Sequence, residues 1–239
     1  LNKNNSFAFT LLADCFSAVG DLENAKKNYE TSLNIEPNNK MALNNLGALN
    51  FFSGDFIEAE KIYKFAVIKN ENNYDAMYYL AQCQLAQSNF VSGWKNFKFR
   101  WLANEFNSKK LKSNLPKFEL NTSKRNLLLW SEQGIGDQIL FLRFLKVLVP
   151  HVDNLFINID TRLHKIIERI YPKICFFNKN DFNKNPNINC QMPLADLGSL
   201  FVKDDTDLIK YNSSNLTSDF DIKKDLKSNK KKKNKFICG

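Results

Sequence analysis

The sequence predicts an α-solenoid of helical repeats followed by a Rossmann-like α/β domain with a parallel sheet. Two observations predict this α plus α/β arrangement. Small and aromatic residues recur about every 34 residues through the first hundred positions. After residue 125, short apolar runs alternate with helical patterns, which is typical of βαβ units around a parallel sheet.

The first 103 residues contain three positions that recur in about three units, which is the pattern of tetratricopeptide repeats. A small residue is followed four positions later by an aromatic one, and a turn residue precedes both. The occupants are Ala25, Ala59 and Gly93, then Tyr29, Tyr63 and Phe97, then Gly20, Gly54 and Ser88. Glycine at the turn permits the left-handed backbone that ends a helix. Cys15 and Cys83 occupy equivalent positions, and we predict both to be core residues.

A stack of such helix pairs has a concave face, lined by the first helix of each pair. Polar and aromatic side chains there could hold an extended peptide through its backbone amides, so a protein or peptide is the expected partner. The alternative is that these positions are merely solvated. The candidate residues of this groove are Asn44, Asn45, Tyr78 and Gln82.

Composition divides the rest of the chain and excludes several classes of function. Residues 104–125 form a polar connector, 126–210 the Rossmann-like half, and 211–235 a Lys-rich solvated linker. The net charge of +9 comes mainly from Lys, and scarce Arg argues against nucleic acid. No apolar run is long enough to span a membrane. The five cysteines form no CxxC pair, which favours a cytoplasmic protein without a metal site.

The chain is expected to be a fragment that lacks both ends. It begins with Leu1 rather than Met, and residues 236–239 read as the opening of a further strand. That strand would begin a second Rossmann-like half.

The most informative stretch is a glycine-bearing turn between a strand and a helix. Residues 126–130 are an apolar strand and residues 137–149 an amphipathic helix, so 132–137 is a βα turn. No Lys or Ser/Thr follows the glycines, which excludes a P-loop. Ile139 stands where a dinucleotide fingerprint needs its third glycine, although Asp160 lies near the place of a ribose-binding acid.

A third template fits this turn. The block "GW..F.FRW" followed by "LLLWSEQGIGDQILFLRFL" resembles a bacterial family of tetratricopeptide proteins with a GT-B glycosyltransferase-like domain. That family is related to heptosyltransferases and O-linked N-acetylglucosamine transferases. Phe118 departs from its usual Trp. The resemblance implies that Asp137 is the general base and that Glu132 and Gln133 orient an acceptor hydroxyl, while the loop is shaped by Gly134 and Gly136.

The residues alone leave Asp137 open to a second interpretation, in which it serves only as the N-cap of the helix. The resemblance implies a nucleotide-sugar donor that is held mainly by the missing half, so this fragment is expected to bind no cofactor and to be inactive alone. Its repeats would recruit a partner, and the acceptor would be a glycan or a protein. The alternative function is a non-catalytic tetratricopeptide scaffold.

Overall fold

The computed structural model describes residues 5–120, 125–177 and 187–212. The chain divides into two units. The repeat unit comprises residues 1–113 and 198–205, and the α/β unit comprises residues 114–197 and 206–239. From residue 213 onward, the predicted linker and the strand at 236–239 lie outside the described residues.

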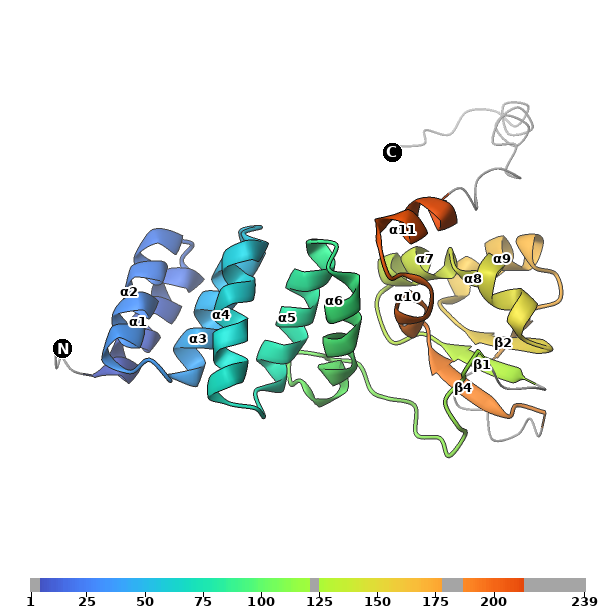
Figure 1. The fold of residues 1–239 in the computed structure, drawn as a ribbon, viewed down its shortest axis with the longest axis horizontal. Coiled ribbons are helices and arrows are strands. Elements are labelled where there is room, and N and C mark those ends of the chain that lie inside the picture. Colours follow the sequence, from blue (N-terminus) through green and yellow to red (C-terminus); the bar gives the residue numbers. More distant parts are fainter. Residues whose placement is uncertain (1–4, 121–124, 178–186, 213–239) are drawn as a thin grey trace, which may run out of the picture. The chain divides into compact units, whose positions relative to one another are not determined.

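The repeat unit contains three successive helix pairs (Figure 1). They are α1 (Ser6–Ala18) with α2 (Leu22–Ile35), α3 (Lys40–Phe52) with α4 (Phe56–Lys69), and α5 (Tyr74–Ala86) with α6 (Phe90–Phe97), which continues into the 3-10 helix η1 (Lys98–Leu102). Every α-helix of these pairs begins after an Asn or Asp whose side chain accepts a hydrogen bond from the first turn. These caps satisfy backbone donors that a helix start leaves unpaired, so each boundary is encoded locally.

The turns within the pairs confirm the predicted repeat register. Gly20, Gly54 and Ser88 have φ angles of 83°, 86° and 61°, which places all three in the left-handed region. The small and aromatic positions are also buried as expected, because Ala59 and Tyr63 are both fully enclosed. The predicted helical-repeat fold is therefore confirmed.

Cys15 is a correction to the predicted core. Cys83 is buried against residues of the preceding repeat, including Ala59 and Tyr63, whereas Cys15 is exposed. The two positions are equivalent in sequence, but the described residues contain no earlier helix pair that could cover Cys15. The repeat pattern predicts where a residue lies within its repeat, but it does not show whether another repeat covers that residue.

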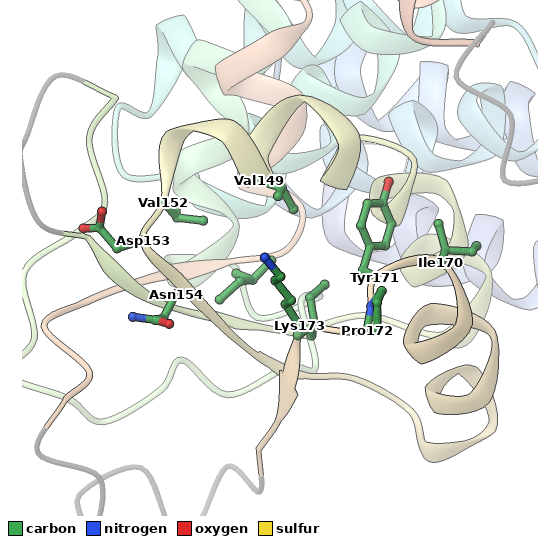
Figure 2. A pocket seen from close by; sticks show the side chains of 10 residues that line it. Val149, Val152, Asp153, Asn154, Ile170, Tyr171, Pro172 and Lys173 are labelled. Carbon is green, nitrogen blue, oxygen red and sulfur yellow. The ribbon is translucent and has the colours of Figure 1, made fainter.

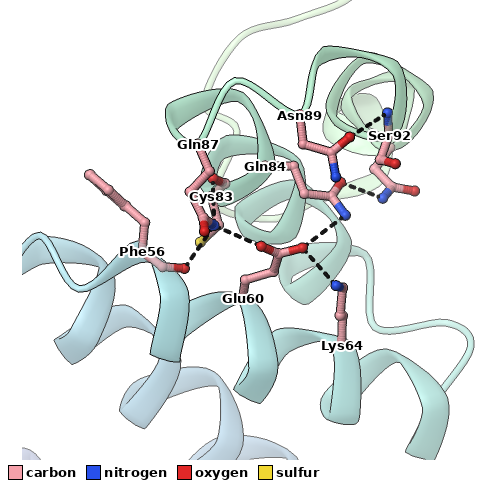
Figure 3. A network of polar contacts seen from close by, with 9 residues as sticks. Phe56, Glu60, Lys64, Cys83, Gln84, Gln87, Asn89 and Ser92 are labelled. Atoms are coloured by element: carbon pink, nitrogen blue, oxygen red, sulfur yellow. Dashed lines mark hydrogen bonds and ion pairs between the residues drawn. The ribbon is translucent and has the colours of Figure 1, made fainter.

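Polar side chains also join successive repeats, as Figure 3 shows around Glu60. The Glu60 carboxylate lies 2.8 Å from Lys64 Nζ and accepts a hydrogen bond of 2.7 Å from Gln87 Nε2. Gln87 Nε2 also donates to the Phe56 carbonyl. The second helix of one repeat is thus bonded to the C-cap of the first helix of the next.

The α/β unit contains a parallel sheet with the strand order β3-β2-β1-β4, which confirms the predicted parallel arrangement. The strands are β1 (Asn126–Trp130), β2 (Asn154–Asn158), β3 (Cys175–Phe176) and β4 (Cys190–Pro193). Leu127 to Trp130 of β1 are almost completely buried, as expected of a central strand whose two faces are covered. This strand carries the glycine turn at its carboxyl end.

The helices of this unit are short. They are α7 (Ile135–Leu142), α8 (Leu145–Leu148), the 3-10 helices η2 (Val149–His151) and η3 (Thr161–Leu163), and α9 (His164–Ile170). The unit boundary falls inside α10 (Asp196–Phe201), whose last four residues belong to the repeat unit, and α11 (Asp205–Asn212) returns to the α/β unit after its first residue. Figure 1 shows α7, α8 and α9 along one face of the sheet. Within the described residues, no helix is long and apolar enough to cross a membrane.

The predicted continuous helix over residues 137–149 was wrong in its bounds. Helix α7 begins two residues earlier, and the chain is interrupted at Arg143 and Phe144 before α8. This interruption accompanies the burial of Phe144 and of the Leu residues in α8. Pro150, which cannot donate a helical hydrogen bond, lies in the 3-10 turn that ends the segment.

Candidate functional site

The glycine turn lies at the switch point of the sheet. Strand β1 is flanked by β2 on one side and by β4 on the other, so the connections after β1 and β4 diverge at their carboxyl ends. Open α/β sheets bind ligands at such a point. The segment from Ser131 to Gly134 leaves β1 there, and residues 194–196 leave β4 beside it.

The carboxylate of Glu132 faces the polypeptide backbone. Its side chain is 6% exposed, and its two oxygens accept hydrogen bonds from the backbone N–H groups of Leu194 (3.0 Å) and Ala195 (3.2 Å). Glu132 thereby joins the end of β1 to the chain that follows β4. The acceptor-orienting role that the family resemblance implies for Glu132 remains a prediction, and this carboxylate already has two strong donors.

Gln138 is a site residue that sequence reasoning missed. Its Nε2 donates to the carbonyl oxygen of Gln133 (3.0 Å), and its Oε1 accepts from the backbone N–H of Asp160 (2.8 Å). One buried amide therefore fixes the glycine turn to the end of β2. The sequence did hold one signal for this role, because Gln138 is a polar residue at a core-facing position of α7.

Asp137 is the third residue of α7 and is exposed. The N-cap is Gly134, so the interpretation of Asp137 as the N-cap was wrong. Its Oδ2 lies 3.6 Å from where a Cβ on Gly134 would be, whereas a Cβ on Gly136 would meet nothing within 4 Å. The turn thus presents one carboxylate beside two glycines, near the positive end of a helix dipole.

Asp160 is engaged by a neighbouring guanidinium. Arg162 donates from Nε (2.9 Å) and from one terminal nitrogen (2.8 Å), and its backbone N–H donates as well (2.9 Å). These hydrogen bonds, the side-chain ones first, lower the pKa of Asp160 to about 2. Asp160 is therefore ionised and paired at the edge where a ribose-binding acid was considered.

A separate cavity of about 310 Å³ lies at the opposite, amino edge of the sheet (Figure 2). Apolar side chains such as Val149, Val152 and Ile170 line it together with Tyr171 and Lys173. None of the residues singled out from the sequence lies in it. Among the described residues, no group of three or more His, Cys, Asp or Glu side chains is placed to hold a metal ion.

The repeat unit has its own cavity, of about 460 Å³, between its first two helix pairs. Helices α1, α2 and α3 line it. One part of the lining is polar, with Asp14, Tyr29 and Asn45, and the rest includes the apolar side chains of Leu22, Leu49 and Phe52. We call this cavity the repeat groove.

The four predicted groove residues lie in different environments. Asn45 lines the repeat groove and donates to Asp14. Asn44 exchanges two hydrogen bonds with the amide of Asn73 at the next helix pair. Tyr78 packs against the rings of Phe97 and Phe106, while Gln82 is half-buried on α5. The structure thus brings Asn45, but not the other three, to this cavity.

Comparison with known proteins supports the repeat assignment. A family model described as a tetratricopeptide repeat matches residues 8–39. A search of curated proteins found no significant match.

Three solved structures are similar to parts of the chain. The first tetratricopeptide domain of Spaghetti (RPAP3), bound to an HSP90 peptide, is 16% identical with a TM-score of 0.39, covering 41% of this chain and 79% of that one. YrrB, described as a tetratricopeptide protein with an unusual peptide-binding site, is 18% identical with a TM-score of 0.38, covering 42% and 58%. A mutant O-GlcNAc transferase of Thermobaculum terrenum is 13% identical with a TM-score of 0.37.

The last match covers 71% of this chain but 41% of the transferase, so the chain spans less than half of that protein's length.

Proposed function

We propose that the protein binds an extended peptide or protein segment in the repeat groove. The observation that carries this proposal is the groove itself, an open cavity of about 460 Å³ whose lining combines hydrogen-bonding groups with exposed apolar side chains. Ligand sites in proteins commonly combine a mainly apolar lining with a few fixed polar groups. Tetratricopeptide stacks form concave surfaces of this kind, which suit extended ligands.

Peptide selection from a random library displayed on phage, against the full 239-residue chain, tests this proposal. Ala48 lines the groove, so Ala48→Arg should fill it and abolish binding of the selected peptides. The matched control is Ala86→Arg, at an exposed position of α5 outside the groove lining. The proposal fails if no peptide is enriched, or if Ala48→Arg binds the selected peptides as well as the unmodified chain.

A second proposed function is that the α/β unit forms the acceptor side of a glycosyltransferase cleft. It is favoured by one observation, the exposed carboxylate of Asp137 beside Gly134 and Gly136 at the switch point. Such a carboxylate can remove the proton of an attacking hydroxyl. Gln133 and Glu132 would orient the acceptor hydroxyl beside Asp137. Glu132 would do so through its hydrogen bonds to the backbone that follows β4. The donor nucleotide sugar would be held by a second half.

This second function is tested in a longer chain that includes a donor-binding half. Asp137→Asn should lower turnover on the order of 10²-fold or more, because general-base catalysis typically contributes that much. Thermal unfolding should hardly change, since Asp137 is exposed. Equal turnover of the Asn variant would show that Asp137 is not the base, and absence of turnover in the unmodified longer chain would leave only the non-catalytic scaffold function. The free cysteines of the described residues suit a reducing compartment, so we propose a cytoplasmic location.

A further inference from the structure

We propose that the repeat groove recognises its partner through a lysine or arginine side chain, whose cationic head binds the carboxylate of Asp14. This inference rests on the proposed peptide-binding function and names the chemistry of the partner. It is carried by the arrangement of three polar side chains in the groove and by the character of the remaining lining.

The hydrogen bonds of Asp14 are concentrated on one oxygen. Tyr29 Oη donates to Asp14 Oδ1 at 2.6 Å, and Asn45 Nδ2 donates to the same oxygen at 2.7 Å. These two donors come from α2 and α3, so they hold the α1 carboxylate in one orientation. Within the described residues, Oδ2 has no such donor, and it remains available to a ligand.

The lining of the groove carries a negative charge, and no positively charged side chain that the structure describes in that lining neutralises it. Asp14 is the one charged residue among the described residues that line it, and the others are Ser, Ala, Leu, Tyr, Asn and Phe. Burial raises the pKa of the Tyr29 hydroxyl, and the hydrogen bond to Asp14 raises it further, so Tyr29 stays a neutral donor. A half-buried carboxylate with one oxygen still open is best matched by a cation that donates hydrogen bonds.

The apolar part of the lining suits the rest of such a residue. Leu22 and Phe52 remain 48% and 75% exposed, and Leu49 lies beside them in the same groove. The methylene stem of a lysine or arginine packs on surfaces of this kind while its head reaches a polar group. A hydrophobic neighbour in the partner peptide would cover Phe52. An acidic peptide would instead place its charge against Asp14.

Two labelled peptides test the inference by fluorescence anisotropy with the full chain. The probe is Gly-Ser-Leu-Lys-Leu-Ser-Gly, and its comparison carries norleucine, which keeps the stem and removes the charge. We expect the Lys peptide to bind on the order of tenfold more tightly, as a charge-assisted hydrogen bond would give. The preference should weaken with salt.

The decisive variant is Asp14→Asn, which keeps an oxygen for Tyr29 and Asn45 but removes the charge. It should bind both peptides equally. Asp55→Asn is the matched control, because it removes the same charge at an exposed helix N-cap outside the groove, where Asn caps equally well. Asp55→Asn should retain the Lys preference.

Each outcome decides the proposal. Equal affinity of the unmodified chain for the two peptides, no binding of the Lys peptide at about 1 mM, or a Lys preference that survives in Asp14→Asn would overturn it. Selected phage peptides that lack basic residues but are blocked by Ala48→Arg would overturn the cation recognition while sustaining the peptide-binding function. Failure of Ala48→Arg to block any peptide would overturn the function itself.

Discussion

The two units each hold a carboxylate at their candidate site, and the two carboxylates have different partners. Asp14 of the repeat unit accepts from two side chains and lines an open cavity. Glu132 of the α/β unit is buried and accepts from two backbone N–H groups. A carboxylate that is bound by the main chain of a distant segment holds the fold together. A carboxylate that is bound by side chains at a cavity can bind a partner as well.

Replacement of Glu132 should have the largest effect. Glu132→Ala leaves the N–H groups of Leu194 and Ala195 without their charged acceptor, which we expect to cost about 3 kcal/mol of unfolding free energy. Hydrogen exchange measured by mass spectrometry should show lost protection in β1 and β4, while α1 to α6 keep theirs. Asp14→Ala is the comparison and should cost about 1 kcal/mol. Equal losses from the two variants would mean that the Glu132 carboxylate contributes no more to folding than that of Asp14.

Two glycines sharpen the contrast between packed and open backbone. A Cβ on Gly47 would lie 2.7 Å from the ring of the buried Tyr63, so Gly47→Ala should cost about 2 kcal/mol through overpacking. A Cβ on Gly136 would meet nothing within 4 Å, and Gly136→Ala should be neutral or stabilise α7 by up to about 1 kcal/mol. Urea unfolding of both variants measures this difference. Destabilisation by Gly136→Ala would show that the glycine turn is more constrained than its open surroundings indicate.

Substitutions at the turn residues of the repeats should have smaller effects on stability, in opposite directions. Ser88 has a φ of 61° at the position where the other two repeats have glycine. Because left-handed backbone costs a non-glycine residue about 1 kcal/mol, Ser88→Gly should stabilise the repeat unit by roughly that amount. Gly54→Ser should destabilise it similarly, since its surroundings leave space and only the backbone is strained. Thermal unfolding of the two variants should therefore shift in opposite directions.

The same contrast explains which features the sequence could predict. The repeat fold follows from local spacing, so Gly20, Gly54 and Ser88 could be aligned without any contact being known. The strands of the α/β unit could be recognised as apolar runs. Glu132, however, bonds to residues 62 and 63 positions later, and Gln138 reaches Asp160. Such partners are set by the order of the strands, which composition and periodicity do not encode.

The groove shows the same limit within the repeats. Asn44 and Asn45 are adjacent in sequence and were predicted together, yet Asn44 bonds to Asn73 and Asn45 to Asp14. Asp14 itself could not be singled out, because its significance depends on Tyr29 and Asn45 meeting at one of its oxygens. Periodicity therefore placed these residues on the first helices of the repeats, while the grouping of their side chains depended on packing between helices.

The smallest expected effect is a pH dependence that belongs to the repeat unit. Burial raises the pKa of Glu60, but hydrogen bonds from Lys64 and Gln87 outweigh it, so the pKa lies below its ordinary value of 4.5. A carboxyl group with a lowered pKa in the folded state contributes stability above its unfolded pKa, and this contribution is lost as the pH falls through the folded value.

Unfolding free energies measured from pH 6 downward should therefore show a loss from Glu60 that begins near pH 4.5 and amounts to about 0.5 kcal/mol, as for other partly exposed ion pairs. Glu60→Gln should flatten this part of the curve for the repeat unit and leave that of the α/β unit unchanged. Glu30→Gln, on the exposed face of α2, provides the control for a change of charge alone. A curve for Glu60→Gln that parallels the unmodified chain would mean that the contacts of the Glu60 carboxylate with Lys64 and Gln87 add no net stability.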